Sequence, residues 1–184
     1  LQHLGTIYSR SGQYQQALAY LTESKAIYEQ QTDVSEGLLG QLAILLRRMG
    51  RYGAARGYAE RVLAQRTARV GAGSPALAYL LYSRAMLERE AGDYEQARGY
   101  FEQMRVLCET KLGDDHMMTK VARFCYGTVL LAEGAAAEAK PYLLQSVYEG
   151  KVAPDSVEFA AEYGYLGDLY TQLDQFDKAA HYLN

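Results

Sequence analysis

The sequence predicts an all-α protein, an α-α superhelix assembled from antiparallel helix pairs. Three observations lead to this fold class: a pattern of turn and small residues that recurs every 38 to 42 residues, apolar residues spaced three and four apart within each copy, and few helix breakers. The 184 residues include 17 tyrosines, no tryptophan and only 3 prolines. With 49% hydrophobic and 22% charged residues, the composition is that of an ordered chain.

The recurring pattern is anchored on a glycine that we interpret as a turn. The anchors are Gly12, Gly50, Gly92 and Gly134, with Asp174 in the corresponding place of a fifth copy. Seven residues before each anchor stands a small residue: Gly5, Ala43, Ala85, Gly127 or Gly167. Two residues after it stands Tyr14, Tyr52, Tyr94, Ala136 or Phe176. Five residues after it stands an alanine in every copy: Ala17, Ala55, Ala97, Ala139 or Ala179.

Each copy therefore indicates a helix, a tight turn and a second helix. Glycine suits the left-handed position that ends a helix, and small residues in both helices let the two backbones approach closely. The aromatic residue after the turn is expected to plug the space between the helices. In the first copy one apolar face runs across both helices: Leu1, Leu4, Tyr8, Leu18, Leu21 and Ile27. Because a single pair cannot bury both of its faces, the copies must stack.

Five helix pairs are expected from this pattern. The helices are predicted at 1–11 with 14–30, 35–49 with 52–69, 76–91 with 94–112, 117–133 with 136–151, and 157–173 with 176–184. The repeats then cover about 1–34, 35–75, 76–116, 117–156 and 157–184 of a single solenoid, the last one truncated. Since neither end shows a polar cap, we expect the chain to be a fragment of a longer protein.

These residues together resemble the tetratricopeptide repeat: the small site, an aromatic such as Tyr8 or Tyr170 three residues later, the turn glycine and the unvarying alanine. The segment KLGDDHMMTKVA (111–122) is similar to the LGxDHxxVA linker of the longer repeats in kinesin light chains and their relatives. RVGAGSPALA (69–78) and KVAPDSVEFA (151–160) are weaker versions of it. The resemblance covers essentially the whole chain and implies a right-handed solenoid whose first helices line a concave groove.

The third and fourth copies depart from the pattern. Arg84 stands where the other copies carry Leu or Tyr, and Glu88 also replaces Leu or Tyr. We therefore expect the first helix of the third copy to be shifted slightly or to make one polar contact. In the fourth copy Ala136 replaces the aromatic residue after the turn, which predicts a looser contact there.

Several classes of function are not indicated. A formal net charge of −3 does not favour nucleic-acid binding, and no apolar run approaches the roughly 18 residues of a membrane span. Cys108 and Cys125 are the only cysteines, and we expect both to be reduced in a cytoplasmic protein. No signal-like segment opens the chain, although a leader preceding Leu1 stays an open alternative.

Catalytic chemistry is not indicated either. The three histidines, His3, His116 and His181, lie in different copies, and no nucleophile–base motif or glycine-rich phosphate loop is present. We expect the adjacent acids Asp114 and Asp115 to cap the helix that follows, and His116 to cap or pack. The expectation is a protein that is not an enzyme, with no cofactor and no metal.

The candidate binding residues come from the resemblance, which implies which first-helix positions face the groove. They are Arg10, Gln41, Ile44, Arg47, Arg48, Tyr79, Tyr82, Met86, Arg89, Phe124, Thr128 and Tyr165. The four arginines would form a basic ladder, and Tyr79, Tyr82, Met86 and Phe124 an apolar patch beside it. The alternative is that the arginines are simply solvated and the aromatic residues pack between repeats. The lysine–asparagine clamp of chaperone-binding relatives is absent, because its asparagine sites fall on His3, Thr6, Gln41 and Ile44.

Three functions remain open at this point. The first is a scaffold or adaptor that holds a partner peptide or helix carrying acidic and aromatic residues, which would pair with the arginines and fill the apolar patch. The second is a ligand- or peptide-sensing module of a larger signalling or transcription-regulating protein. The third is self-association through the repeat ends.

Overall fold

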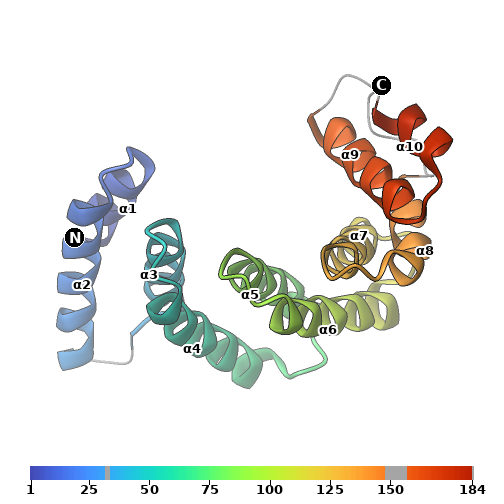
Figure 1. The fold of residues 1–184 in the computed structure, drawn as a ribbon. Coiled ribbons are helices and arrows are strands. Elements are labelled where there is room, and N and C mark those ends of the chain that lie inside the picture. The colour runs from blue at the N-terminus through green and yellow to red at the C-terminus, as the bar shows by residue number, and fades with distance from the viewer. Residues whose placement is uncertain (32–33, 148–156, 184) are drawn as a thin grey trace. The chain divides into compact units, whose positions relative to one another are not determined.

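The structure, a computed structural model, describes residues 1–31, 34–147 and 157–183, and these residues form helices joined by turns and short connections (Figure 1). The elements are α1 (Gln2–Arg10), α2 (Tyr14–Gln31), α3 (Glu36–Arg48), α4 (Tyr52–Val70), the short 3-10 helix η1 (Pro75–Leu77), α5 (Ala78–Glu90), α6 (Tyr94–Leu112), α7 (Met117–Ala132), α8 (Ala136–Val147), α9 (Val157–Gln172) and α10 (Phe176–Leu183). The all-α fold of paired helices predicted from the sequence is confirmed.

The helix bounds lie within two residues of the predicted ones wherever the chain is described. The largest difference is at the third copy, where residues 75–77 form a 3-10 turn and α5 begins at Ala78 rather than 76. The predicted end of the eighth helix at 151 lies outside the described residues, as does most of the linker-like segment 151–160. None of the described helices combines the length and apolar character needed to cross a bilayer.

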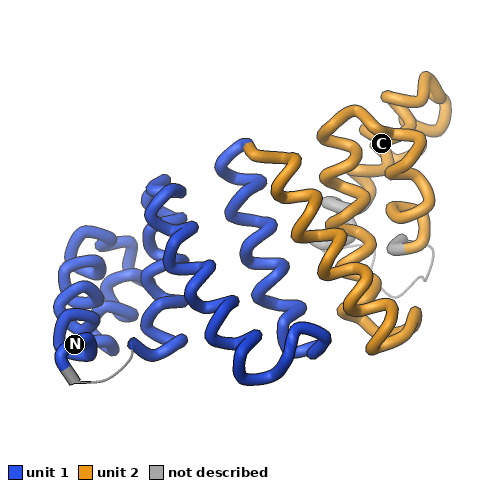
Figure 2. The backbone as a smooth tube through the Cα atoms, turned by 90° about the horizontal axis from the view of Figure 1, so that it is seen from below, with its two compact units in different colours: residues 1–92 blue, residues 93–184 orange. Residues whose placement is uncertain are grey.

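The chain divides into two compact units, Leu1–Gly92 and Asp93–Asn184 (Figure 2). In the first unit α1 packs on α2 and α3 packs on α4, while α2 contacts α3 and α4 contacts α5. In the second unit α6 packs on α7, α7 on α8 and α9 on α10, while α8 and α7 contact α9. In each unit, helix pairs therefore pack side by side.

The turn at each anchor has the left-handed conformation that its glycine predicted. Gly12, Gly50, Gly92 and Gly134 have φ values of 77°, 71°, 83° and 80°, and Asp174 has the only positive φ of a described non-glycine residue, 56°. In the first turn the Gln13 amide donates to the Tyr8 carbonyl over 2.9 Å, and the Arg51 amide donates to the Leu46 carbonyl over 2.8 Å in the second. These bonds close the helix ends in the Schellman arrangement.

The small site seven residues before the turn is required by close helix contact. A Cβ atom added to Gly5 would lie 2.6 Å from Leu21 Cδ2, and one added to Gly127 would lie 2.9 Å from Leu143 Cγ. Leu21 and Leu143 hold the same place in their copies, nine residues after the turn. In each of these pairs a leucine of the second helix packs directly against the backbone of the first.

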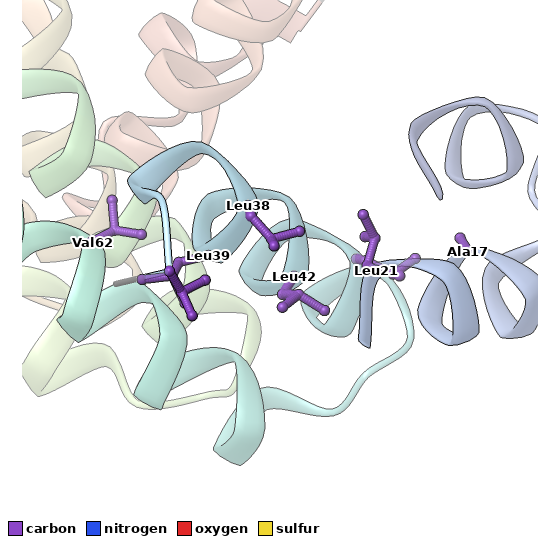
Figure 3. Close-up of a cluster of buried hydrophobic side chains, with 8 residues drawn as sticks. Ala17, Leu21, Leu38, Leu39, Leu42 and Val62 are labelled. Atoms are coloured by element: carbon purple, nitrogen blue, oxygen red, sulfur yellow. The ribbon is translucent and has the colours of Figure 1, made fainter. Parts of the chain in front are cut away.

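The core of the first unit joins neighbouring pairs. Figure 3 shows Ala17 and Leu21 of α2 pointing toward Leu38, Leu39 and Leu42 of α3, with Val62 of α4 beyond them. In the second unit the core lies between α7, α8 and α9, and its members are Leu130, Leu131, Ala136, Ala139, Leu143, Leu166 and Leu169. These clusters supply the interface that stacks one pair on the next.

Three sequence expectations about packing need correction. The aromatic residue after the turn does not plug every pair, because Tyr94 is 41% and Phe176 63% exposed. Ala136 in the same place is buried in the core, so a small side chain closes that contact. The apolar face of the first copy is only partly covered, since Leu1 and Leu4 are exposed while Tyr8 and Leu18 pack against the core.

The departure in the third copy appears as a buried ionic contact between α4 and α5. Arg84 and Glu88 are 2% and 0% exposed, and Arg84 Nη1 lies 2.7 Å from Glu88 Oε1. Glu88 Oε2 also accepts a hydrogen bond from Arg56 Nε over 2.7 Å, and Arg84 Nη2 lies 2.9 Å from Glu60 Oε1. The polar contact expected from the sequence is therefore confirmed, and it is a network of four charged side chains.

Candidate functional site

The first helices of unit 1 carry two neighbouring hollows on their exposed faces. The first, which we call the α1–α3 hollow, has a volume of about 160 Å³ and is lined by Thr6, Ser9, Arg10, Leu21, Gln41, Ile44 and Arg48. The second, the α3–α5 hollow, has a volume of about 260 Å³ and is lined by Ala43, Ile44, Arg47, Arg48, Ala59, Tyr79, Tyr82, Ser83, Met86 and Leu87. Because Ile44 and Arg48 line both, the two hollows adjoin along α3.

The α1–α3 hollow has a mostly apolar lining with two arginines at its rim. Arg10 and Arg48 are exposed at its rim, and neither has an ion-pair partner among the described residues. The Gln41 Oε1 atom is buried and accepts no hydrogen bond from any described residue. The floor of the hollow is the buried side chain of Leu21. This hollow thus offers two cations without an ion-pair partner among the described residues.

The α3–α5 hollow is walled by aromatic and sulfur-containing side chains. Tyr79 is 63% exposed, and its ring lies 6.4 Å from that of Tyr82 with an interplanar angle of 28°. Met86 and Ile44 complete the apolar wall, and Ile44 is also exposed. Aromatic rings and methionine are the side chains that most readily accommodate a partner's ring.

The α3–α5 hollow is lined on the α4 side by a small residue, Ala59. Ala59 stands nine residues after the turn, where the neighbouring pair carries Leu21 and the fourth pair carries Leu143. Ala43 faces it in place of the glycine that those leucines require. Alanine at both positions omits the leucine side chain that fills this place in the first pair, and the half-buried Ala59 lines the hollow.

The charge at the two hollows is uneven. Together they are lined by Arg10, Arg47 and Arg48 and by no acidic side chain of the described chain. Arg47, however, forms an ion pair with Glu90 at the end of α5, and the side chains are 29% and 34% exposed. Of the two cations beside the aromatic wall, Arg47 is therefore already neutralised, whereas Arg48, which both hollows share, and Arg10 are not neutralised by any described residue.

The structure brings most of the predicted binding residues of unit 1 together. Arg10, Gln41, Ile44, Arg47, Arg48, Tyr79, Tyr82 and Met86 all line one or both hollows. Arg89 is half-buried and lines neither hollow. The ladder of four arginines is thus represented at the hollows by three of its members.

The remaining predicted binding residues lie in unit 2. Phe124 of α7 and Tyr165 of α9 pack edge to face with their ring centroids 5.5 Å apart. Thr128 is buried, and its hydroxyl donates to the Cys125 carbonyl over 2.9 Å, so this side chain presents little surface. Phe124 and Tyr165 are both partly buried against the core of unit 2.

Two residues of the site were missed by the sequence reasoning. Glu90 was not considered, although it lies two residues before Gly92 and Arg47 lies three residues before Gly50. Because Arg47 and Glu90 carry opposite charges at nearly equivalent positions of adjacent copies, the sequence did contain a signal for this ion pair. Ala59 was also missed, and the signal there was the absence of the large apolar residue that the other copies carry nine residues after the turn: Leu21, Phe101, Leu143 or Leu183.

The residues once considered for other chemistry have structural roles. His116, and not Asp114 or Asp115, caps α7, because its Nδ1 atom accepts a hydrogen bond from the Met118 amide over 3.1 Å. The expected aspartate cap is therefore wrong, and Asp114 instead pairs with Arg123. Burial raises the pKa of the Cys108 thiol, with a further increase from Glu109, so this thiol is a poor nucleophile.

The described residues contain no grouping of three or more histidine, cysteine, aspartate or glutamate side chains that would hold a metal ion.

Solved structures show where this arrangement of helices occurs. BtubC (BKLC) from P. vanneervenii superposes with a TM-score of 0.79 at 18% identity, covering 98% of this chain and 74% of that chain. A Podosopora anserina protein, described as a kinesin light chain with nearly identical TPR-like repeats, gives 0.79 at 20% identity over 99% and 89% of the two chains. A tetratricopeptide repeat protein from Parabacteroides merdae ATCC 43184 gives 0.71 at 20% over 98% and 60%. At these identities the likeness concerns the fold.

Sequence comparison identifies the family. One family model, described as a tetratricopeptide repeat, matches residues 34–110, and a second with the same description matches residues 1–35. A search of curated proteins found no match. The two matched ranges contain both hollows described above and the turns at Gly12, Gly50 and Gly92. The chain belongs to the tetratricopeptide-repeat family.

Proposed function

We propose that this chain is a non-catalytic scaffold or adaptor that binds a peptide or helix of a partner protein across the first helices of unit 1. Tetratricopeptide repeats are generally protein-interaction modules, which supports a binding role. The observation that carries the proposal is the pair of adjoining hollows, lined by three arginines and exposed apolar side chains and by no described acidic residue.

The proposed partner segment carries acidic and aromatic residues. Acidic side chains complement Arg10 and Arg48, and they are attracted over a range set by the Debye length of the solution. An aromatic side chain complements Tyr79, Tyr82 and Met86, since aromatic residues and arginines are enriched where binding energy is concentrated. Phe124 and Tyr165 are a separate proposed contact on unit 2.

Peptide binding to the whole chain tests this proposal. The probe is a panel of fluorescent 12-residue peptides, each with one tyrosine or phenylalanine and one aspartate or glutamate at varied spacing. A matched panel replaces the acid by its amide and the ring by alanine. Binding is followed by fluorescence anisotropy at two salt concentrations, because an electrostatic contribution weakens as salt increases.

Two double variants separate the groove from general surface charge. Arg10→Ala/Arg48→Ala should weaken binding of the acid-and-ring peptides by about five- to tenfold and reduce the salt dependence, because both groove cations are lost. Arg51→Ala/Arg61→Ala removes the same charge from exposed residues outside the hollows and should change affinity little. Equal losses in the two variants, or no peptide binding at all, would reject the proposed surface.

A further inference from the structure

We propose that Ala59 and Glu90 sort the partner's side chains between the two hollows, an inference that rests on the function proposed above. The α3–α5 hollow takes a large uncharged side chain, because Ala59 opens it and Glu90 has already neutralised Arg47, so its only arginine without an ion-pair partner in the described part of the chain is Arg48, which it shares with the other hollow. The α1–α3 hollow takes a carboxylate, because Arg10 and Arg48 have no ion-pair partner among the described residues. These two residues therefore determine the register in which a partner segment binds.

The two hollows differ in volume. In the first pair Leu21 fills the place opposite Gly5, so closely that an added Cβ would lie 2.6 Å from Leu21 Cδ2. The hollow above that leucine has about 160 Å³. In the second pair Ala59 and Ala43 leave the corresponding place unfilled, and the hollow has about 260 Å³. The larger side chain of a partner therefore fits the second hollow.

The walls of the α3–α5 hollow suit a partner's ring. Tyr79 and Tyr82 present ring faces and edges, and Met86 adds a flexible, polarisable side chain. A partner ring inserted between them would exchange water for aromatic and sulfur contacts. Tyr79 is 63% exposed in the structure, so an inserted ring would also remove apolar surface of the protein from water.

The arginines of the two hollows differ in whether they already form an ion pair. A partner carboxylate that approached Arg47 would have to displace the carboxylate of Glu90, which already forms an ion pair with that guanidinium. No such exchange is needed at Arg10, which lines the α1–α3 hollow alone, or at Arg48, which lines both hollows.

Filling the second hollow tests the volume argument. The double variant Ala43→Gly/Ala59→Leu recreates the glycine–leucine pair of the first repeat, so the leucine has the room that Leu21 has. The affinity of ring-containing peptides should fall about tenfold or more, to that of their alanine counterparts, because the ring loses its buried site. Ala43→Gly alone is the matched control and should still distinguish ring from alanine. If the double variant also distinguishes them, the assignment is overturned.

Freeing Arg47 tests the charge argument without altering the core. In the wild-type chain, a second acid in the peptide should add little affinity. In Glu90→Gln it should tighten binding by about two- to fivefold, the range expected for an exposed ion pair, because Arg47 becomes available. Glu29→Gln is the matched control, since it removes the same charge from an exposed pair with Lys25 outside both hollows. Equal behaviour of the two variants would overturn the role of Glu90.

The two proposals fail in different ways. If no peptide of the panel binds the wild-type chain, the proposed function is rejected, and the sorting of side chains with it. If acid-and-ring peptides bind and lose affinity in Arg10→Ala/Arg48→Ala, while Ala43→Gly/Ala59→Leu and Glu90→Gln behave as their controls, only the sorting is overturned. Circular dichroism of each variant establishes that it folds as the wild-type chain does.

Discussion

The two contacts between successive pairs in unit 1 are closed by opposite kinds of chemistry. Between α2 and α3 the buried side chains are apolar, with Leu21, Leu38 and Leu42 almost completely removed from water. Between α4 and α5 the equivalent of Leu42 is Arg84, which pairs with the fully buried Glu88. Apolar burial is non-directional and tolerates adjustment, whereas a buried charge requires its partner at hydrogen-bonding distance. Similar helix pairs therefore stack with different tolerance to change.

The largest expected effect comes from a variant that removes one partner of the buried ionic contact, Glu88, and keeps the other, Arg84. Glu88→Leu would remove the buried carboxylate shared by Arg84 and Arg56 and leave the buried Arg84 with only the largely exposed Glu60, at a cost of about 3–5 kcal/mol. Urea unfolding followed by circular dichroism measures the loss. Glu60→Gln is the control, because Glu60 is largely exposed and its removal should cost far less. A Glu88→Leu variant as stable as the wild type would show that the pair has no role in holding α5.

The next largest effect comes from a variant that weakens the apolar contact between α2 and α3. Leu42→Ala should destabilise the chain by about 2–5 kcal/mol, because the fully buried leucine leaves a cavity between α2 and α3. The same unfolding experiment at low and high salt distinguishes the two contacts. The loss for Leu42→Ala should not depend on salt, and a strong salt dependence would contradict a purely apolar contact.

A third variant converts the ionic contact into the apolar kind. Arg84→Leu/Glu88→Leu copies Leu42 and Leu46 of the preceding repeat and should be neutral, or stabilising by up to about 1–4 kcal/mol, because no buried charge remains. Arg56 is one-third exposed and would turn to solvent. A double variant as unstable as Glu88→Leu alone would mean that leucines do not pack at this contact.

The smallest effect comes from an ion pair near the surface. A hydrogen bond from Arg66 lowers the pKa of Glu36 below its ordinary value of 4.5, with attraction from Arg66 and Arg69 acting in the same direction and burial opposing it. The carboxylate therefore stabilises the fold above about pH 4.5, and this contribution is lost as the pH falls through the folded-state pKa. Glu36→Gln should be slightly less stable than the wild type at pH 7 and equally stable well below pH 4. Thermal unfolding across this pH range checks the convergence, and a constant difference would contradict it.

The helix pairs were predictable because their determinants are local. A glycine at each turn, a small residue seven positions before it and an alanine five positions after it fix where each helix ends and how closely two helices pack. Asp174 could be placed at the fifth turn by spacing alone, and it adopts the left-handed conformation there. The aspartate cap expected for α7 was wrong, whereas His116, which was expected to cap or pack, forms the cap; the three residues are adjacent and all can accept a hydrogen bond.

The details of the candidate site were less predictable because they depend on contacts between copies. Spacing placed Arg47 on the first-helix face, but only the structure shows that Glu90 of the next copy pairs with it. Likewise, the size of the α3–α5 hollow depends on Ala43 and Ala59, which belong to different helices. Thr128 shows the converse, since a position expected to face the groove is buried.

The buried charges of α5 also limit how repeats of this chain can be rearranged. A copy that packs on its neighbour through leucines could be exchanged for another such copy, because apolar surfaces of similar volume can pack against one another. The copy containing Arg84 and Glu88 is matched to a neighbour that supplies charges at the places of Arg56 and Glu60, which complete the buried network. In a chain whose repeats stood in another order, the buried Glu88 would lack part of its network, and the chain would be less stable.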